Sequence, residues 1–158
     1  MRRMRRMFKI FIFLSFASIA IYSCTHISGT FVSSNGSMAG SSMKDNCMDC
    51  HQKGATQGGF TVAGTLFQSD SIKRYPNGFV ELYNQPPDSL GTPTDTVIAR
   101  IDVDGVGNFY TTHPIDLSQG VYPRVTSSLG YKRSMQGPIT SGACNSCHGV
   151  STANIHVD

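Results

Sequence analysis

The amino-acid sequence predicts a mainly β fold: a small antiparallel β-sandwich with little helix, flanked by two C-x-x-C-H segments. Between these segments apolar residues alternate with a period of two, which is the spacing of a half-buried strand and not of a helix. The 158 residues include 16 Gly and no Trp, and only 15% are charged, a composition that suits short strands and turns better than a helical bundle. The length is sufficient for one ordinary domain.

The N-terminal residues have the pattern of an export signal. Met1–Lys9 is strongly basic, and Ile10–Ile21 is apolar apart from two serines. This apolar run is shorter than the roughly 20 residues that span a bilayer as a helix, and it has the length of a signal-peptide core. A short membrane anchor that stays attached is the alternative.

The apolar run ends in Ile21-Tyr22-Ser23-Cys24, which resembles a bacterial lipobox. The resemblance implies a lipoprotein signal peptide over residues 1–23 and a lipid on Cys24, the first mature residue. Residues 24–43 are rich in Ser and Gly without a regular hydrophobic period, as in a flexible tether. The chain is therefore expected to be an exported bacterial lipoprotein, held on the periplasmic side of a membrane or at the cell surface.

The formal net charge of +3 comes from the leader and not from the rest of the chain. Without Met1–Lys9, 8 basic residues face 10 acidic residues, which gives a net charge of −2. The remaining sequence has no basic stripe interleaved with aromatic residues, the pattern typical of nucleic-acid binding. No nucleic-acid partner is therefore expected.

Six segments within residues 60–135, the expected sandwich core, have the pattern of strands. The pattern is clearest in Thr96–Val103, where every second residue is apolar and Arg100 and Asp102 lie on the opposite face. Asn84–Thr94 contains three prolines and is expected to be a loop. The six candidate strands are Thr61–Phe67, Gly78–Tyr83, Thr96–Val103, Phe109–Thr112, Val121–Thr126 and Gly130–Met135.

Several runs within these strands belong to one recurring pattern: Val62-Ala63-Gly64-Thr65-Leu66, Val80-Glu81-Leu82-Tyr83, Asp102-Val103-Asp104-Gly105-Val106-Gly107-Asn108-Phe109-Tyr110, Gly120-Val121-Tyr122 and Gly130-Tyr131. Together they resemble the transthyretin-like, carboxypeptidase-regulatory class of β-sandwich, over roughly half of the chain. Such domains are commonly scaffolds or adhesion modules. The resemblance therefore implies a fold and says little about activity.

Four of the five cysteines fall in two copies of one motif, Cys47-Met48-Asp49-Cys50-His51 and Cys144-Asn145-Ser146-Cys147-His148. Two thiols three residues apart at the start of a helical turn reach the two vinyl groups on one side of a porphyrin, and the next residue brings an imidazole under the iron. The motifs therefore predict two covalently bound haem c groups. The attachment residues are Cys47, Cys50, Cys144 and Cys147, and the proximal iron ligands are His51 and His148.

Three other uses of these cysteines compete with haem attachment. A zinc ribbon is disfavoured because 93 residues separate Cys50 from Cys144, far more than the usual spacing between ligand pairs. Two short disulfides, or a redox-active C-x-x-C of the thioredoxin type, leave the His after each pair unexplained. No βαβ pattern surrounds either pair.

The two motifs resemble those of multihaem c-type cytochromes, over ten residues of the chain. The resemblance implies thioether attachment in the periplasm, electron transfer, and a second axial ligand from elsewhere in the chain. Residues 44–158 are thus expected to form a di-haem cytochrome domain for extracytoplasmic respiration, without catalytic residues, whose redox partners are other cytochromes or quinol-linked complexes. The alternatives are a di-haem redox enzyme of the peroxidase or reductase kind, and a subunit of a haem-stacking conductive assembly, such as a homo-oligomer or filament.

Two histidines are candidate distal iron ligands. His113 follows the fourth expected strand, and an even number of alternating strands puts both motifs and His113 at one end of the sandwich. His156 lies close in sequence to the second motif. We expect bis-histidine ligation of both haems, with His26 on the tether as an incidental residue. The rival ligands, which would raise the reduction potential, are Met38, Met43, Met135 and Met48, the last of which lies within its own motif and cannot reach across.

Overall fold

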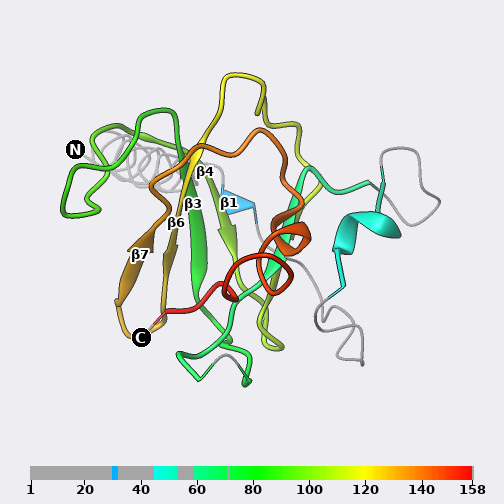
Figure 1. The fold of residues 1–158 in the computed structure, drawn as a ribbon. Coiled ribbons are helices and arrows are strands. Elements are labelled where there is room, and N and C mark those ends of the chain that lie inside the picture. The colour runs from blue at the N-terminus through cyan, green and yellow to red at the C-terminus, as the bar shows by residue number, and fades with distance from the viewer. Residues whose placement is uncertain (1–29, 32–44, 53–58, 71, 158) are drawn as a thin grey trace, which may run out of the picture.

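The computed structural model describes residues 30–31, 45–52, 59–70 and 72–157 (Figure 1). The expected signal peptide, Cys24, His26, Met38 and Met43 lie outside these residues. The described residues form strands and two short 3₁₀ helices, and this mainly β architecture with little helix confirms the expected fold class. None of their helices is long and apolar enough to cross a bilayer. The elements are β1 (Thr30–Phe31), η2 (Cys47–Asp49), β2 (Val62–Thr65), β3 (Phe79–Tyr83), β4 (Val97–Asp102), β5 (Asn108–Thr111), β6 (Tyr122–Thr126), β7 (Lys132–Ser134) and η3 (Cys144–Ser146).

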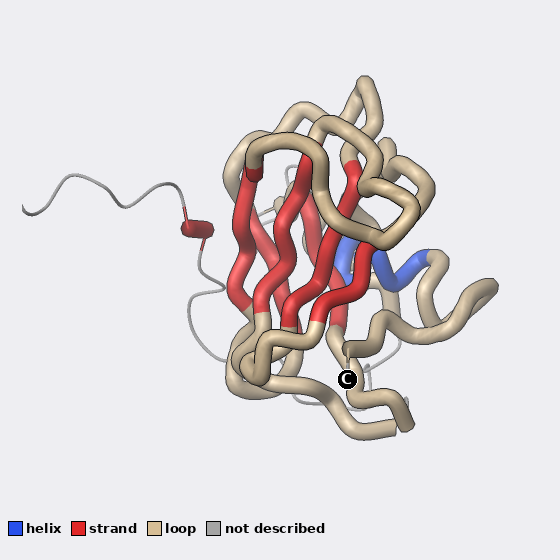
Figure 2. The backbone as a smooth tube through the Cα atoms, turned by 90° about the vertical axis from the view of Figure 1, so that its left-hand side faces the viewer, coloured by secondary structure: helices blue, strands red, loops and turns tan. Residues whose placement is uncertain are grey.

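The strands form two sheets that pack against each other (Figures 1 and 2). The larger sheet has the order β1-β4-β3-β6-β7, and the smaller sheet is the pair β2-β5. Neighbouring strands are antiparallel except β1, which runs parallel to β4. All six expected strands are present, and each lies within two residues of its predicted bounds. β1 is an additional strand, in the segment for which the sequence predicts a tether.

The hydrophobic core lies between the two sheets. The alternation predicted along β4 is confirmed for Ala99, Ile101 and the following Val103, all of which are buried. Val97, at the start of the strand, is 44% exposed and does not join them. Each fully buried aliphatic side chain contributes roughly 1.5–3 kcal/mol to stability. The most deeply buried apolar residues are Val62, Leu66, Val80, Leu82, Ile101, Phe109, Val121 and Val157.

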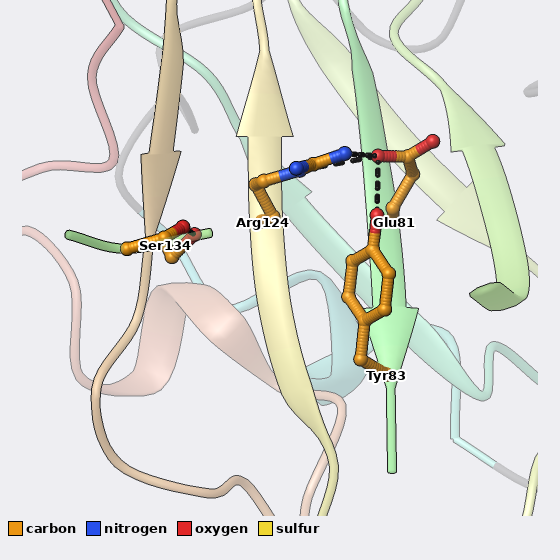
Figure 3. Close-up of polar contacts among 5 residues, drawn as sticks. Glu81, Tyr83, Arg124 and Ser134 are labelled. Carbon is orange, nitrogen blue, oxygen red and sulfur yellow. Dashed lines mark hydrogen bonds and ion pairs between the residues drawn. The ribbon is translucent and has the colours of Figure 1, made fainter. Parts of the chain in front are cut away.

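The outer face of the larger sheet carries a polar network, and the loop that joins β3 to β4 folds over this side of the sheet (Figure 1). Glu81 accepts hydrogen bonds from Nη2 of Arg124 at 2.6 Å and from the hydroxyl of Tyr83 at 2.8 Å (Figure 3). Burial, and then the bond to Glu81, raise the pKa of Tyr83 to about 12, so this hydroxyl remains a donor. Ser134 donates to the carbonyl of Gly91 at 2.6 Å and holds the loop to the sheet. These side-chain hydrogen bonds therefore stabilise the outer face of the larger sheet and hold the loop between β3 and β4 on it.

The inner face of the larger sheet is covered partly by β2 and β5 and partly by the C-terminal segment, residues 139–157. This segment approaches β2 so closely at Gly142 that a Cβ atom there would collide with the β2 backbone. Ala143 forms a parallel bridge with Ala63 of β2, and Val157 is fully buried in the core. The second C-x-x-C-H motif thus belongs to a segment that completes the sandwich.

Candidate functional site

The second motif forms one tight turn in the C-terminal segment. The carbonyl of Cys144 accepts hydrogen bonds from the backbone N–H groups of Cys147 (3.3 Å) and His148 (3.0 Å), which gathers the two thiols and the imidazole locally. Nδ1 of His148 lies 2.7 Å from the carbonyl oxygen of Ala153. Because a carbonyl only accepts, Nδ1 carries the proton. In the neutral imidazole this leaves Nε2 of His148 as the nitrogen that can bind a metal.

A cavity of about 530 Å³ lies between the second motif and the inner face of the larger sheet. Sites for small molecules and cofactors have volumes of about 300–1,000 Å³, so the cavity is of suitable size. One wall contains Cys144, Cys147 and His148. The opposite wall is largely apolar and comes from β3, β6, β7 and the residues after them: Val80, Leu82, Pro123, Val125, Met135, Pro138 and Ile139.

Two of the candidate distal ligands line the same cavity. His156 forms a parallel bridge with Phe67, and its Nδ1 donates to the carbonyl of Asn154 at 2.9 Å, so in the neutral imidazole its Nε2 is also the nitrogen that can bind a metal. Nη1 of Arg133 donates a hydrogen bond to this Nε2. Met135 is 38% exposed at the cavity wall and lies outside the hydrophobic core. The cavity is therefore lined by two alternative pairs of potential iron ligands, His148 with His156 and His148 with Met135.

The first motif has the same backbone turn and lies outside this cavity. Asn46 caps η2 by accepting the N–H of Met48 at 3.1 Å. The N–H of His51 donates to the carbonyl of Cys47 at 3.0 Å, the same bond as in the second motif. Cys50 is exposed and Cys47 is half-buried, as are Cys147 and Cys144 respectively. None of the residues of the first motif lines the cavity at the second motif.

Aromatic stacking holds the imidazole of the first motif against the smaller sheet. His51 stacks on Phe60 with ring centroids 4.0 Å apart and an interplanar angle of 7°, and Phe60 stacks on Tyr110 of β5 at 4.5 Å and 20°. His113 follows β5, is exposed, and donates its backbone N–H to Oγ1 of Thr111 at 3.1 Å. His113 and His51 therefore flank the same end of the smaller sheet, and neither lines the cavity.

The two motifs meet at β2, since both η2 and η3 contact this strand. Gly64 permits this approach, because a Cβ at this position would lie only 2.9 Å from the Cβ of Cys144. In the second motif, Nδ2 of Asn145 donates to the carbonyl of Asp45, just before the first motif, at 3.3 Å. Burial, and then the nearby thiol of Cys47, raise the pKa of Cys144 to about 12. These surroundings favour an uncharged sulfur, such as that of a thioether.

Sequence patterns do not indicate Asn145, Arg133 or the cavity. Asn145 occupies a variable position of C-x-x-C-H, where a polar residue carries no signal of burial. Arg133 stands in an expected strand between two other polar residues, and nothing local relates it to His156. The cavity is lined by residues of distant strands together with the second motif, so only the assembled fold reveals it.

Among the described residues, no group of three or more His, Cys, Asp and Glu side chains is arranged to hold a metal ion. A haem site does not need such a group, because the porphyrin supplies most of the iron ligands and the chain supplies only the axial ones. No protein-family model, no curated protein and no solved structure matches this chain. Function is therefore argued from the site itself.

Proposed function

We propose that the protein is an electron carrier, a di-haem c-type cytochrome tethered to a membrane by a lipid on Cys24. The cavity at the second motif carries this proposal. It combines a volume of about 530 Å³, two thiols, an imidazole whose Nε2 can bind a metal, and an apolar wall opposite them. A porphyrin is flat and largely apolar, so these residues fit its chemistry. When bound, haem c carries one electron at a time through the change in oxidation state of its iron.

In the second site, each side chain has a separate task. Cys144 and Cys147 provide the sulfur atoms for attachment, and His148 provides the proximal nitrogen, with its ring fixed by the carbonyl of Ala153. His156 is the preferred distal ligand, because its Nε2 can bind a metal and it lines the same cavity. Arg133 would have to release this nitrogen for His156 to bind an iron, and its guanidinium would then suit a carboxylate of the haem.

In the first site, Cys47 and Cys50 attach the haem and His51 is the proximal ligand. The stack of His51 on Phe60 supports this role, because it fixes the plane of the imidazole before any cofactor is present. His113 is the candidate distal ligand, since it lies at the same end of the smaller sheet. Its exposed position implies that it reaches the iron from a loop and not from a preformed cavity.

Electron transfer is favoured over catalysis because His148 and His156 both line the second cavity and would together supply two iron ligands, which would leave no open iron there for a substrate. The same proposal includes a transthyretin-like sandwich as scaffold and other cytochromes or quinol-linked complexes as partners. A peroxidase- or reductase-like enzyme requires an open axial position. Spin state therefore separates the two functions.

The whole chain, produced in a host that matures c-type cytochromes, should contain two haems that survive acid-acetone extraction. Haem is counted from the pyridine haemochrome spectrum and from the intact mass. Both ferric haems should be low-spin by electron paramagnetic resonance, whereas a high-spin haem in the purified protein would favour the enzyme. Recovery of zinc in place of haem from such a host would contradict the proposal outright.

Anchoring is tested separately, because lipid and haem use different cysteines. Cys24→Ser should move the protein from the membrane fraction to the soluble fraction while its haem spectrum stays unchanged. A variant that remains in the membrane fraction after signal cleavage would exclude Cys24 as the anchor and leave the haem assignment untouched.

A further inference from the structure

Asn145 is the one buried residue among the ten residues of the two motifs, all of which the structure describes, with 5% of its surface exposed. Its side-chain amide is fully engaged. Oδ1 accepts the backbone N–H of Thr65 at 3.1 Å, and Nδ2 donates to Oγ1 of Thr65 at 3.2 Å and to the carbonyl of Asp45 at 3.3 Å. One amide therefore joins the second motif both to β2 and to the residues that lead into the first motif.

A buried amide is costly unless its hydrogen bonds are made, so these three bonds specify one arrangement of the segments they join. The bond to Asp45 joins residues 100 positions apart in the sequence. Asn145 directly follows Cys144, and Asp45 stands two residues before Cys47. The first cysteine of each motif is thereby held close to the other. The contribution of Cys47 to the raised pKa of Cys144 agrees with this proximity.

We propose that Asn145 is a positioning residue that fixes the two haems relative to each other, so that they form an electronically coupled pair. This role rests on the proposed function, because it requires haem at both motifs. Each haem is attached through the first cysteine of its motif, and these two cysteines are the groups that the Asn145–Asp45 bond keeps together. Loss of this bond removes the direct link between the two motifs, so the first motif can shift relative to the second about the remaining stack of His51 on Phe60, while both attachments remain intact.

Coupling between the haems is measured by circular dichroism in the Soret band, where two adjacent haems give a pair of bands of opposite sign. The wild-type protein should show this pair. In Asn145→Ala the pair should collapse towards the sum of two isolated haems, with the haem count unchanged. Ser146→Ala is the matched control, because Ser146 is the exposed neighbour in the same motif and its hydroxyl bonds only locally, to the carbonyl of Ala143 and the sulfur of Cys147.

Two further variants separate positioning from general stability. Thr65→Val removes the hydroxyl bond to Asn145 and leaves the Asp45 bond, so it should lower the melting temperature and keep the paired bands. Asn145→Asp retains an acceptor for the N–H of Thr65 but cannot donate to Asp45, so it should weaken the paired bands as Ala does. Because Asp is close to Asn in size, Asn145→Asp also provides the test if the Ala variant does not fold.

The outcomes are distinguishable from failure of the proposed function. Haem absent from the wild-type protein would remove the premise, which the haem count detects first. Two haems whose Soret dichroism equals the sum of the two single-haem variants, Cys47→Ala/Cys50→Ala and Cys144→Ala/Cys147→Ala, would overturn the coupled pair. Paired bands that persist in both Asn145 variants would overturn the role of Asn145.

Discussion

The two C-x-x-C-H motifs have the same local structure and very different surroundings. In each, the His N–H donates to the carbonyl of the first Cys at 3.0 Å, so the pattern alone determines the turn. The first motif precedes the sandwich and lies at the end of its smaller sheet. The second belongs to the segment that covers the inner face of the larger sheet and faces a cavity of about 530 Å³. The motif thus determines a local turn, whereas its tertiary contacts decide whether a haem bound there would also be part of the core.

The largest expected effect is a difference in stability between the two pairs of cysteine substitutions. Cys144→Ala/Cys147→Ala leaves the cavity unfilled and should lower the free energy of unfolding by about 5 kcal/mol, the upper range for cavity-forming substitutions. Cys47→Ala/Cys50→Ala should lose its haem with much less destabilisation. Urea denaturation followed by far-UV circular dichroism compares them, and equal losses would show that the second haem is no more part of the core than the first.

The next largest effect is the loss of a single axial ligand. His156→Ala should turn one haem high-spin and let it bind carbon monoxide when reduced, while the haem count stays the same. His113→Ala should do this to the other haem, and His26→Ala to neither. Absorption and electron paramagnetic resonance spectra in the two single-haem backgrounds assign each change. If Met135→Ala changes the second haem and His156→Ala does not, its ligation is His/Met.

A smaller effect is expected in the reduction potentials. The second haem should have the higher potential, because its apolar walls and the nearby Arg133 disfavour the extra positive charge of ferric iron. Spectroelectrochemical titration of the di-haem protein, compared with Cys47→Ala/Cys50→Ala, assigns the two values. Arg133→Gln should lower only the potential of the second haem. A higher reduction potential at the first haem than at the second would contradict this prediction.

The smallest expected effect is that of Phe60→Leu. This substitution removes both aromatic stacks at the first motif and should cost about 1 kcal/mol, the usual value of such a pair. It should alter the spectrum of the first haem and leave the second unchanged. Tyr131→Leu, at an exposed aromatic residue of the hairpin between β6 and β7, is the control for general effects of losing a ring.

The strands and the motifs were predictable because both depend on local patterns. The alternation around Ala99 and Ile101 defines β4 without reference to its neighbours, and the spacing of each C-x-x-C-H motif determines its turn. The order of strands in the sheet, the docking of the C-terminal segment at Gly142 and the cavity depend on contacts between distant residues. For the same reason the sequence does not indicate that Met135 is exposed at the cavity wall.

The docking of the C-terminal segment on β2 has a consequence for the order of maturation. Thr65 and Asn145 are 80 positions apart, and contacts of such separation form late in folding. Once the segment has docked, Cys144 is packed beside Gly64, whereas Cys147 remains exposed. If haem binds at the second motif as proposed, its attachment to Cys144 is expected to be faster before the sandwich closes than after it. In protein made without haem, a maleimide reagent should label Cys147 well before Cys144, and equal rates would contradict this order.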